Sequence, residues 1–572
     1  MKNNKLGTIL ACAIVLLFSL GTQFQLFRWD VTSEKRYSVS ENTQELMEQL
    51  KGEYDVKIYL DGDLSAGFLR LRKSTKEMLE EFQAYSDAGI NIIFENPTQG
   101  KDEEAQNKHY EELEQKGLRI LLDNEDKNDE GQRIERLVCP WVTVSQRSSE
   151  NKKTRSVNVC LYKEQDGASR EECLVNSEAN LEYALTDAFR QLANTKVSKI
   201  AFIEGHGEKP DALTYDIEKE LSHYYQIDKG QPGNCPDSLF SYKAIIVAGP
   251  TSSFSEEEKF VLDQYIMNGG KVLWLIDGVR ISLDSLRTQS ATIGIANDVN
   301  LQDMLFRYGA RIEPVLVQDV QCVKVPVNTA RENEAPKWKP MPWYYSPLLL
   351  TAPNHPITKN VTPVKSEFTS GINFVGKDDK DVKKYILLVT STSSHVQQMP
   401  GMVSMNIVNV EQNGQYFNAA NIPVAVAMEG HFTSVYKNRM IPKGVYTDQM
   451  FSDKSYTTKM IIVANSSVIC NEVTPGQNGG MNIVPLGYDR YEGRQYGNKD
   501  FILNCVNYLT DDKGWMDLRA RELQLRLLNV PATKMKTFWK SVNIFFPLIV
   551  LGLFGAAFLF IRKKKYGVKK TA

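Results

Sequence analysis

The sequence predicts an α/β protein that crosses a membrane at both ends and holds most of its chain outside the bilayer. Two observations favour this class. Short apolar runs alternate with amphipathic, helix-like runs, and no charged residue occurs between Leu6 and Phe27 or between Ser541 and Ile561. A helix rises about 1.5 Å per residue, so each uncharged run can cross a hydrocarbon core of about 30 Å.

Length and composition exclude several other classes. The chain has 572 residues, enough for about three to four domains. Its 42% hydrophobic and 24% charged residues are typical of a globular protein. The 68 basic and 70 acidic residues leave a net charge of −2, without the basic surplus of a nucleic-acid binder. Six histidines make a histidine-rich metal site improbable, and we expect no metal and no cofactor.

Lysine and arginine placement orients the two predicted spans. A basic tail, residues 562–572, follows the second run, and Lys2 and Lys5 precede the first. Such residues mark cytoplasmic flanks. We therefore expect an anchor with a short cytoplasmic start at residues 1–30 and a second span at residues 541–561. Both termini are then cytoplasmic and the bulk of the chain is periplasmic, in the inner membrane of a bacterium.

The first uncharged run has a second interpretation, as a cleaved signal peptide. Ser19-Leu20-Gly21 is compatible with signal-peptidase cleavage, but the apolar character continues to Phe27. That length favours a retained anchor. Both interpretations export most of the chain.

The cysteines do not indicate a disulfide or zinc framework. Outside the first run they number seven, no two form a CxxC pair, and none has zinc spacing with a histidine. An odd number leaves at least one free thiol or an intermolecular bond. Small buried apolar side chains are the simpler interpretation. The seven are Cys139, Cys160, Cys173, Cys235, Cys322, Cys470 and Cys505.

Residues 31–195 predict a first periplasmic module with the element order of a thioredoxin-type fold. The order is strand, helix, strand, helix, strand, strand, helix. A redox dithiol would lie between the first strand and the first helix, but that segment, Asp61–Gly67, contains no cysteine. Pro140 stands where such folds place a cis-proline. The sequence therefore predicts the scaffold without its thiol chemistry. The runs are 54–60, 66–87, 90–94, 101–116, 139–144, 154–161 and 176–193.

Residues 196–515 predict a larger, doubly wound α/β module, similar to flavodoxin or glutamine-amidotransferase folds. Apolar strand runs alternate with helix-like runs and short glycine turns, as in parallel sheets. A β-rich insertion occupies about residues 290–450. The strand runs are Lys199–Ile203, Ala244–Ala248, Lys271–Ile276 and Met460–Ala464, and the helix runs are 212–224, 255–267 and 497–509.

The best candidate site is the EGHGE turn, residues 204–208, at the carboxyl end of the first strand of this module. Ligands bind at that edge of open α/β sheets. Glu204, His206 and Glu208 are therefore candidate ligand-binding residues. Asp489 and Arg490, in the later PLGYDR run, can join them at the sheet end. The simpler interpretation of EGHGE is a tight strand-to-helix turn in which His206 hydrogen-bonds to the backbone. The simpler interpretation of Asp489 and Arg490 is an ordinary salt-bridged loop.

The sequence carries no catalytic motif. GxSxG, HExxH and P-loop patterns are absent, so the chain is not an ATPase. Two alternatives to a scaffold role remain open. One is an exported hydrolase or amidotransferase-like enzyme with His206 as base, which needs a nucleophile on a sharp elbow. The other is a carbohydrate or lipid binder working through the EGHGE turn and the PLGYDR loop.

The membrane-proximal residues 516–540 predict an amphipathic helix. Within the run Asp517–Asn529, leucines gather on one side and arginines are interspersed. Such a helix suits lipid headgroups or an acidic partner surface.

Long runs of the sequence resemble the gliding-motility ABC transporter accessory protein family, GldG. Examples are IAFIEGHGE (200–208), FSEEEKFVLDQYIMNGGKVLWLID (254–277) and PLGYDRYEGRQYGNKDFILNCVNYL (485–509). The resemblance covers nearly the whole chain. It implies a Bacteroidetes inner-membrane protein, described as substrate-binding-like, that associates with a multi-span permease subunit (GldF-like) and a cytoplasmic ATPase (GldA-like). It brings no established catalytic or ligand residues.

The function that we expect is therefore a non-enzymatic periplasmic subunit of an ABC transporter. It would act as a scaffold or as a ligand-sensing component, with membrane lipid and transporter subunits as its partners and no nucleic acid.

Overall fold

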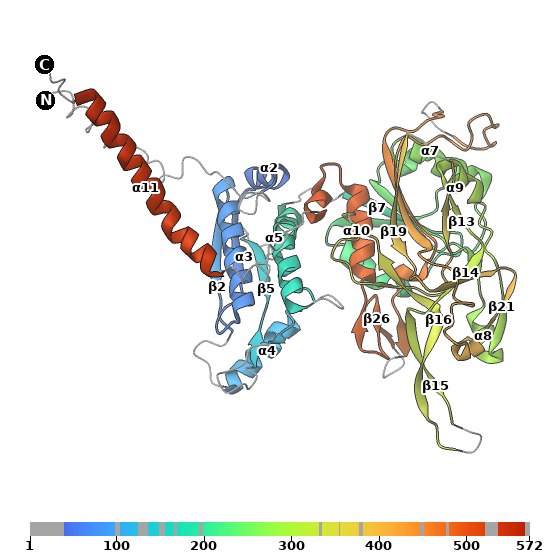
Figure 1. The fold of residues 1–572 in the computed structure, drawn as a ribbon. Coiled ribbons are helices and arrows are strands. Elements are labelled where there is room, and N and C mark those ends of the chain that lie inside the picture. Colours follow the sequence, from blue (N-terminus) through green and yellow to red (C-terminus); the bar gives the residue numbers. More distant parts are fainter. Residues whose placement is uncertain are drawn as a thin grey trace. The chain divides into compact units, whose positions relative to one another are not determined.

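The computed structural model describes most of the chain as two compact units, Met1–Glu522 and Leu523–Ala572 (Figure 1). The first predicted span, at residues 1–30, and the predicted juxtamembrane run from residue 521 to 535 lie outside the described residues. The described ranges are 39–97, 103–123, 135–147, 155–164, 169–193, 198–330, 334–353, 355–376, 381–446, 451–475, 480–520 and 536–566, with residue 354 omitted.

The N-terminal module is built on a four-stranded sheet with strand order β2-β1-β5-β6. β1 pairs parallel with β2 and antiparallel with β5, which pairs antiparallel with β6. β3 and β4 form a separate hairpin. The elements are α2 (Glu41–Gln49), β1 (Glu53–Ile58), α3 (Ala66–Tyr85), β2 (Gly89–Phe94), α4 (Glu103–Gln115), β3 (Leu121–Asp123), β4 (Arg136–Val138), β5 (Trp141–Arg147), β6 (Arg155–Cys160) and α5 (Arg170–Ala193).

Alternating apolar residues give this module its own core. Tyr54, Val56 and Ile58 of β1 are buried, as period-two alternation requires of one strand face. The ring of Phe189 on α5 packs edge-to-face on Tyr54 and on Phe82 of α3, at centroid distances of 5.5 and 5.9 Å. Among the described residues the cis peptide bond is Met399–Pro400, so the bond before Pro140 is trans.

The second module contains a parallel sheet with the order β23-β10-β9-β7-β8. In chain order this is 5-4-3-1-2, the doubly wound order of flavodoxin-like sheets. The pairs β7–β8, β7–β9, β9–β10 and β10–β23 are all parallel. The elements are β7 (Ser198–Ile203), α6 (Asp211–Leu221), β8 (Tyr225–Gly230), η1 (Pro236–Leu239), β9 (Ala244–Ala248), α7 (Glu256–Met267), β10 (Val272–Leu275), β23 (Thr458–Val463) and α10 (Asn498–Thr510).

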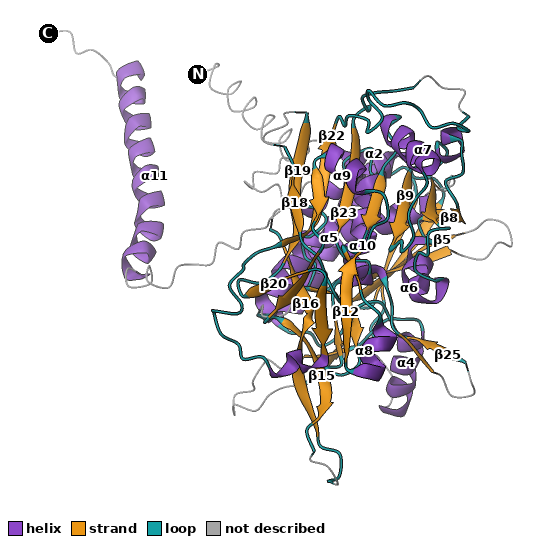
Figure 2. Ribbon diagram, turned by 90° about the vertical axis from the view of Figure 1, so that its right-hand side faces the viewer, coloured by secondary structure: helices purple, strands orange, loops and turns teal. Residues whose placement is uncertain are grey.

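The β-rich stretch within this module extends the same sheet. β22 (Pro423–Gly430) pairs antiparallel with β23, and β19 (Val382–Val389), β16 (Trp338–Thr351) and β15 (Cys322–Asn328) continue outward. β15 and β16 form a long hairpin that projects from the module (Figures 1 and 2). β17 (Val364–Lys365) pairs with β16. The result is a ten-stranded mixed sheet.

Small sheets and short helices complete the stretch and the segment that follows it. They are β11 (Val279–Arg280), α8 (Leu283–Gln289), β12 (Ala291–Ala296), α9 (Gln302–Tyr308), β13 (Ala310–Ile312), β14 (Val315–Asp319), β18 (Ile372–Phe374), β20 (Ser394–Gln398), β21 (Gly401–Ser404), η2 (Met405–Asn409), η3 (Ser467–Ile469), β24 (Val473–Pro475), β25 (Met481–Ile483), β26 (Tyr488–Asp489), β27 (Arg494–Gln495) and η4 (Trp515–Ala520).

Helices cover both faces of the parallel sheet. Ile217 of α6 and Phe501 of α10 belong to one buried cluster. Phe260 of α7 and Met304 of α9 belong to the cluster on the opposite face. Every residue of β9 and of β10 is buried between these layers (Figure 2).

The second unit contains α11 (Lys536–Tyr566). Its segment Lys540–Lys565 has a mean hydropathy of 2.7, and none of it is buried within the structure. Length and composition allow this helix to cross a membrane. It is the one such helix in the part of the chain that the structure describes.

Candidate functional site

The candidate site lies where β7, β9, β10 and β23 end. Parallel strands present their carboxyl ends at one edge of a sheet, so the four following loops meet there. β7 has β8 on one side and β9 on the other. The strand order therefore reverses at the gap between β7 and β9, and the EGHGE turn follows directly after β7.

His206 is the centre of this turn and is only 4% exposed. Its Nδ1 lies 3.2 Å from Oε1 of Glu208, and its Nε2 lies 3.1 Å from Oε2 of Glu258 on α7. Its backbone N–H donates to Oε2 of Glu208 at 2.7 Å. Because both ring nitrogens face carboxylate oxygens, the doubly protonated imidazolium satisfies both contacts, whereas a neutral ring satisfies one.

Burial alone would lower the pKa of His206, because it disfavours the charged ring. Hydrogen bonds and charge from Glu208 and Glu258 outweigh burial and raise that pKa. Burial pushes the pKa of Glu258 upward, but His206 and the Ser255 N–H and hydroxyl overcome it and lower the pKa. The ring of Phe254 stacks on His206 at 3.6 Å between centroids, with 14° between the planes. An aromatic face favours a cation.

The turn is also fastened to the loop after β9. The backbone N–H groups of Thr251 and Ser252 both donate to the carbonyl of His206 at 2.8 Å. Gly207 has φ of +72°, and a Cβ there would meet Oγ1 of Thr251 at 2.2 Å. Glycine therefore permits the close approach that joins the two loops. The gap where the strand order reverses is filled by protein groups.

A second polar cluster adjoins the turn. The Asp277 carboxylate, after β10, accepts from the backbone N–H of Ser466 at 2.6 Å and from the Ser466 hydroxyl. Lys209 Nζ lies 3.7 Å from Asp277. Sequence reasoning missed these three residues, although Lys209 directly follows EGHGE and Asp277 directly follows an apolar strand run.

This cluster does not form a nucleophilic site. The Ser466 hydroxyl donates to a carboxylate, and both nitrogens of His206 contact other carboxylates. The nearby Cys470 thiol donates to the carbonyl of Ser466, and burial raises its pKa to about 12. A thiol with so high a pKa is largely protonated and a poor nucleophile at neutral pH.

A pocket of about 610 Å³ opens beside the end of β10. Its size lies within the range of small-molecule sites. Asp277 and Gly278 form one part of its wall, and Phe306 and Arg311 line it on α9 and β13. Among the predicted site residues, none lines this pocket.

The other predicted site residues lie apart from His206. Glu204 is exposed, and its backbone N–H donates to Gly230. Asp489 is fully buried, accepts from the N–H of Tyr491 at 2.8 Å, and lies 3.7 Å from Lys365 Nζ. Arg490 pairs with Glu472 at 3.0 Å.

Within the described ranges, no hydrogen bond or ion pair joins Asp489 or Arg490 to the turn. The same ranges contain no group of three or more histidine, cysteine, aspartate or glutamate side chains placed to hold a metal ion.

These features define a mixed α/β protein with an apolar C-terminal helix long enough to cross a membrane. The chain matches, over residues 198–505, a family described as an ABC-type uncharacterized transport system. This match covers more than half of the chain, so the chain belongs to that family. Residues 33–145 match a domain of unknown function (DUF7088).

Comparison with individual proteins adds little to the family assignment. No curated protein matches the chain. Among solved structures, the mmIFT52 N-terminal domain is similar, with 14% identity over 55% of this chain and 99% of that one, at a TM-score of 0.31. At that TM-score the likeness establishes no common fold.

His206→Gln tests the electrostatic role of the turn. The folded-state pKa of His206 is raised above its unfolded value of about 6.5. Its stabilisation is therefore complete below that pH and is lost as the pH rises through the folded-state pKa. We expect the substitution to cost about 1–3 kcal/mol at pH 6, as lost charge-assisted hydrogen bonds do, and much less at pH 9. Chemical unfolding at the two pH values measures the difference.

His223→Gln is the matched control, because His223 is exposed on the same module. It should leave stability unchanged at both pH values. An equal loss for His206→Gln at pH 6 and pH 9 would show that the imidazolium contacts are not what stabilises the turn.

Proposed function

We propose that this protein is a non-catalytic, periplasmic subunit of a Bacteroidetes gliding-associated ABC transporter of the GldG type. It acts as a scaffold or substrate-binding-like component beside a GldF-like permease and a GldA-like ATPase. The observation that carries the proposal is membership of an ABC transport family across residues 198–505. That family implies permease and ATPase partners in general. The exposed apolar surface of α11 supports placement in the same membrane.

The proposed topology has two spans, residues 1–30 and 541–561, with cytoplasmic termini. The tail after the second span is basic, which supports a cytoplasmic C-terminus. The periplasmic chain then divides into a module at 31–195, a larger domain at 196–515 with a β-rich insertion at about 290–450, and a juxtamembrane segment at 516–540. The first residues of that segment, 516–520, belong to the 3-10 helix η4 and pack on the larger domain instead of forming an amphipathic α-helix.

The proposed N-terminal module is a thioredoxin-type scaffold without a dithiol. The strand order β2-β1-β5-β6, with one parallel and two antiparallel pairs, supports this fold. The segment from Asp61 to Gly67 lacks cysteine, and burial raises the pKa of the nearby Cys139 thiol to about 12. Both features support a structural role for the module.

The rival function, an exported hydrolase with His206 as base, has less support. A general base needs a free nitrogen within reach of a proton on the substrate or nucleophile. Both nitrogens of His206 contact carboxylates, and the ring is stacked against Phe254. A His206→Ala variant that stayed folded but lost a defined hydrolytic activity would favour the enzyme.

A ligand-sensing role has one specific observation in its favour, the pocket of about 610 Å³ beside β10. It lies at the carboxyl edge, where ligands bind in open α/β sheets. The candidate ligand-binding residues Glu204, His206, Glu208, Asp489 and Arg490 stay a separate proposal, because none of them lines this pocket.

Affinity purification tests the transporter assignment. Full-length protein carrying a C-terminal tag should recover a multi-span permease and an ABC ATPase from detergent-solubilised membranes. Leu551→Arg should abolish recovery of both, because a charge at the centre of a span costs about 3 kcal/mol. Met440→Arg, on an exposed ectodomain loop, is the control and should keep both partners. Recovery of neither protein by the unaltered chain would refute the assignment.

Cysteine labelling tests the topology. Met440 is 90% exposed, so Met440→Cys should react with a membrane-impermeant maleimide in intact spheroplasts, above the unaltered background. Thr571→Cys, in the basic tail, should react only after the membrane is permeabilised. Protection of Met440→Cys until permeabilisation would place the ectodomain in the cytoplasm and overturn the periplasmic assignment.

Thermal-shift screening with soluble carbohydrates and lipid headgroup analogues tests ligand sensing. A ligand at saturating concentration should raise the Tm by about 2–4 °C for each kcal/mol by which its binding stabilises the folded protein. Ala296→Phe adds bulk to the pocket wall and should abolish the shift. Ile293→Phe, on the same strand but outside the lining, should retain it. A panel without any shift would favour the pure scaffold.

A further inference from the structure

The two periplasmic modules have separate cores. The buried cluster of the first module draws its members from residues 39–192. The cluster on the facing side of the second module draws its buried members from residues 200–516. Interfaces between domains with separate cores resemble transient protein interfaces, so relative movement is the default expectation unless the contact is large and apolar.

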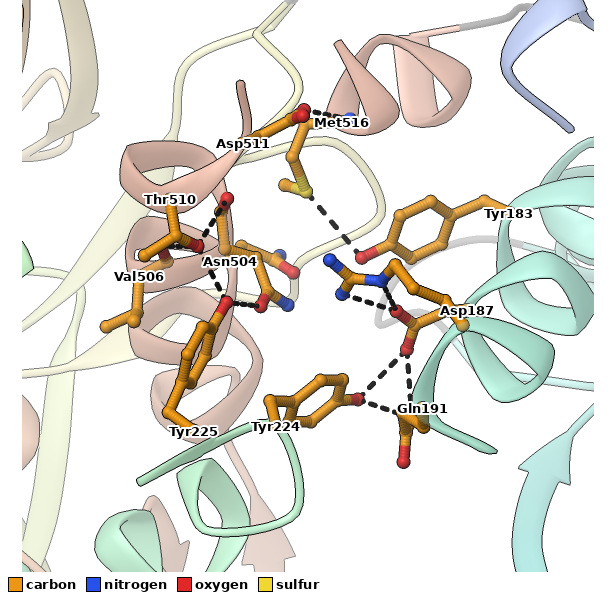
Figure 3. A network of polar contacts seen from close by, with 12 residues as sticks. Tyr183, Asp187, Gln191, Tyr224, Tyr225, Asn504, Val506, Thr510, Asp511 and Met516 are labelled. Carbon is orange, nitrogen blue, oxygen red and sulfur yellow. Dashed lines mark hydrogen bonds and ion pairs between the residues drawn. The ribbon is translucent and has the colours of Figure 1, made fainter. Parts of the chain in front are cut away.

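The junction between the modules is mainly polar (Figure 3). On α5, the Asp187 carboxylate accepts from the hydroxyl of Tyr224 at 2.9 Å. Gln191 Nε2 donates to the same hydroxyl at 2.9 Å. Two exposed ion pairs flank this network, Lys513–Glu45 at 2.6 Å and Lys163–Asp500 at 3.1 Å. Exposed pairs contribute little, and their charges are hydrated when the contact opens.

The 3-10 helix η4 lies in this junction and is the last described element before α11. It belongs to the second module, because the backbone N–H of Met516 donates to Asp511 at 2.8 Å and the Met516 side chain enters that module's core. Arg519 donates to the Asn504 side chain and to the Lys359 carbonyl. Met516 and Arg519 are 2% and 7% exposed.

The same helix contacts Tyr183 of α5 in the first module. The Tyr183 hydroxyl donates to Met516 Sδ at 3.6 Å, and the Arg519 guanidinium lies over the Tyr183 ring at 5.1 Å. A desolvated guanidinium over an aromatic face is among the stronger side-chain contacts. η4 therefore supplies buried contacts to the junction, beside the contact of the Arg190 guanidinium with the Tyr224 ring at 5.7 Å.

We propose that η4 is a clasp, which joins the two periplasmic modules when Met516 and Arg519 contact Tyr183 and lets them separate when it is withdrawn. In the sequence, residues 521–535 separate η4 from α11. This inference concerns the ectodomain alone and does not depend on which transporter the chain serves.

Carbodiimide cross-linking of the full-length protein tests the clasp without added probes. The reagent joins a lysine amine to a carboxylate in direct contact. The Lys513–Glu45 and Lys163–Asp500 pairs report the junction, and the Lys499–Asp216 pair, at 2.9 Å within the second module, is the internal reference. Arg519→Ala should lower both junction cross-links at least about fivefold relative to the reference, the scale of a typical coupling between sites.

Arg490→Ala is the matched control. Like Arg519, Arg490 lies over a tyrosine ring, here at 4.8 Å, but it is on the β26–β27 hairpin and pairs with Glu472. It should leave the cross-link ratio unchanged. If Arg519→Ala disturbs the second module, the reference cross-link falls as well. Tyr183→Leu, which removes the contact from the α5 side, then tests whether η4 joins the modules. Unchanged junction cross-links in Tyr183→Leu and Arg519→Ala would overturn the proposal.

Discussion

Burial of β9 and β10 on both faces is the constraint on which the larger module depends. A parallel strand in that position needs helices above and below it, because neither face can be left to water. α6 and α7 follow directly on their strands, but α10 comes from residues 498–510, after the entire β-rich stretch. The chain must therefore return to the sheet before it leaves the module, and this return places η4 beside α5.

The same topology determines what the EGHGE turn can do. The carboxyl edge of the sheet brings together loops that are far apart in sequence, and here they bind one another. His206 is enclosed by Glu208, Glu258 and Phe254, and its carbonyl accepts two N–H groups from the loop after β9. The position that commonly binds a cofactor in doubly wound sheets is thus occupied by the chain itself, and open space lies farther along the edge, beside Asp277.

Local sequence patterns predict helices and strands of the parallel sheet, but they do not predict which distant residues these elements contact. The apolar runs KIAFI and AIIVA correspond to β7 and β9, and the Ser255–Glu258 spacing forms a capping box at the start of α7. No local pattern shows that the same Glu258 carboxylate also reaches His206, 52 positions earlier. Local patterns likewise do not show the contact of Asp277 with Ser466, because it depends on β10 pairing with β23 across the β-rich stretch. That stretch was expected to be β-rich, but its extension of the parallel sheet by antiparallel strands is set by edge pairing, which side-chain periodicity does not encode.

Separate cores and a polar junction give the two modules two kinds of contact with different energetic costs. Opening the exposed flanking ion pairs exchanges them for water, which costs little. The half-buried hydrogen bond between Tyr224 and Asp187 costs more to break. Withdrawing Met516 and Arg519 from between α10 and α5 exposes an apolar side chain and leaves the Asn504 oxygen and the Tyr183 ring without their partners. η4 therefore adds buried contacts, separate from the Asp187–Tyr224 network, that any separation of the two modules must break.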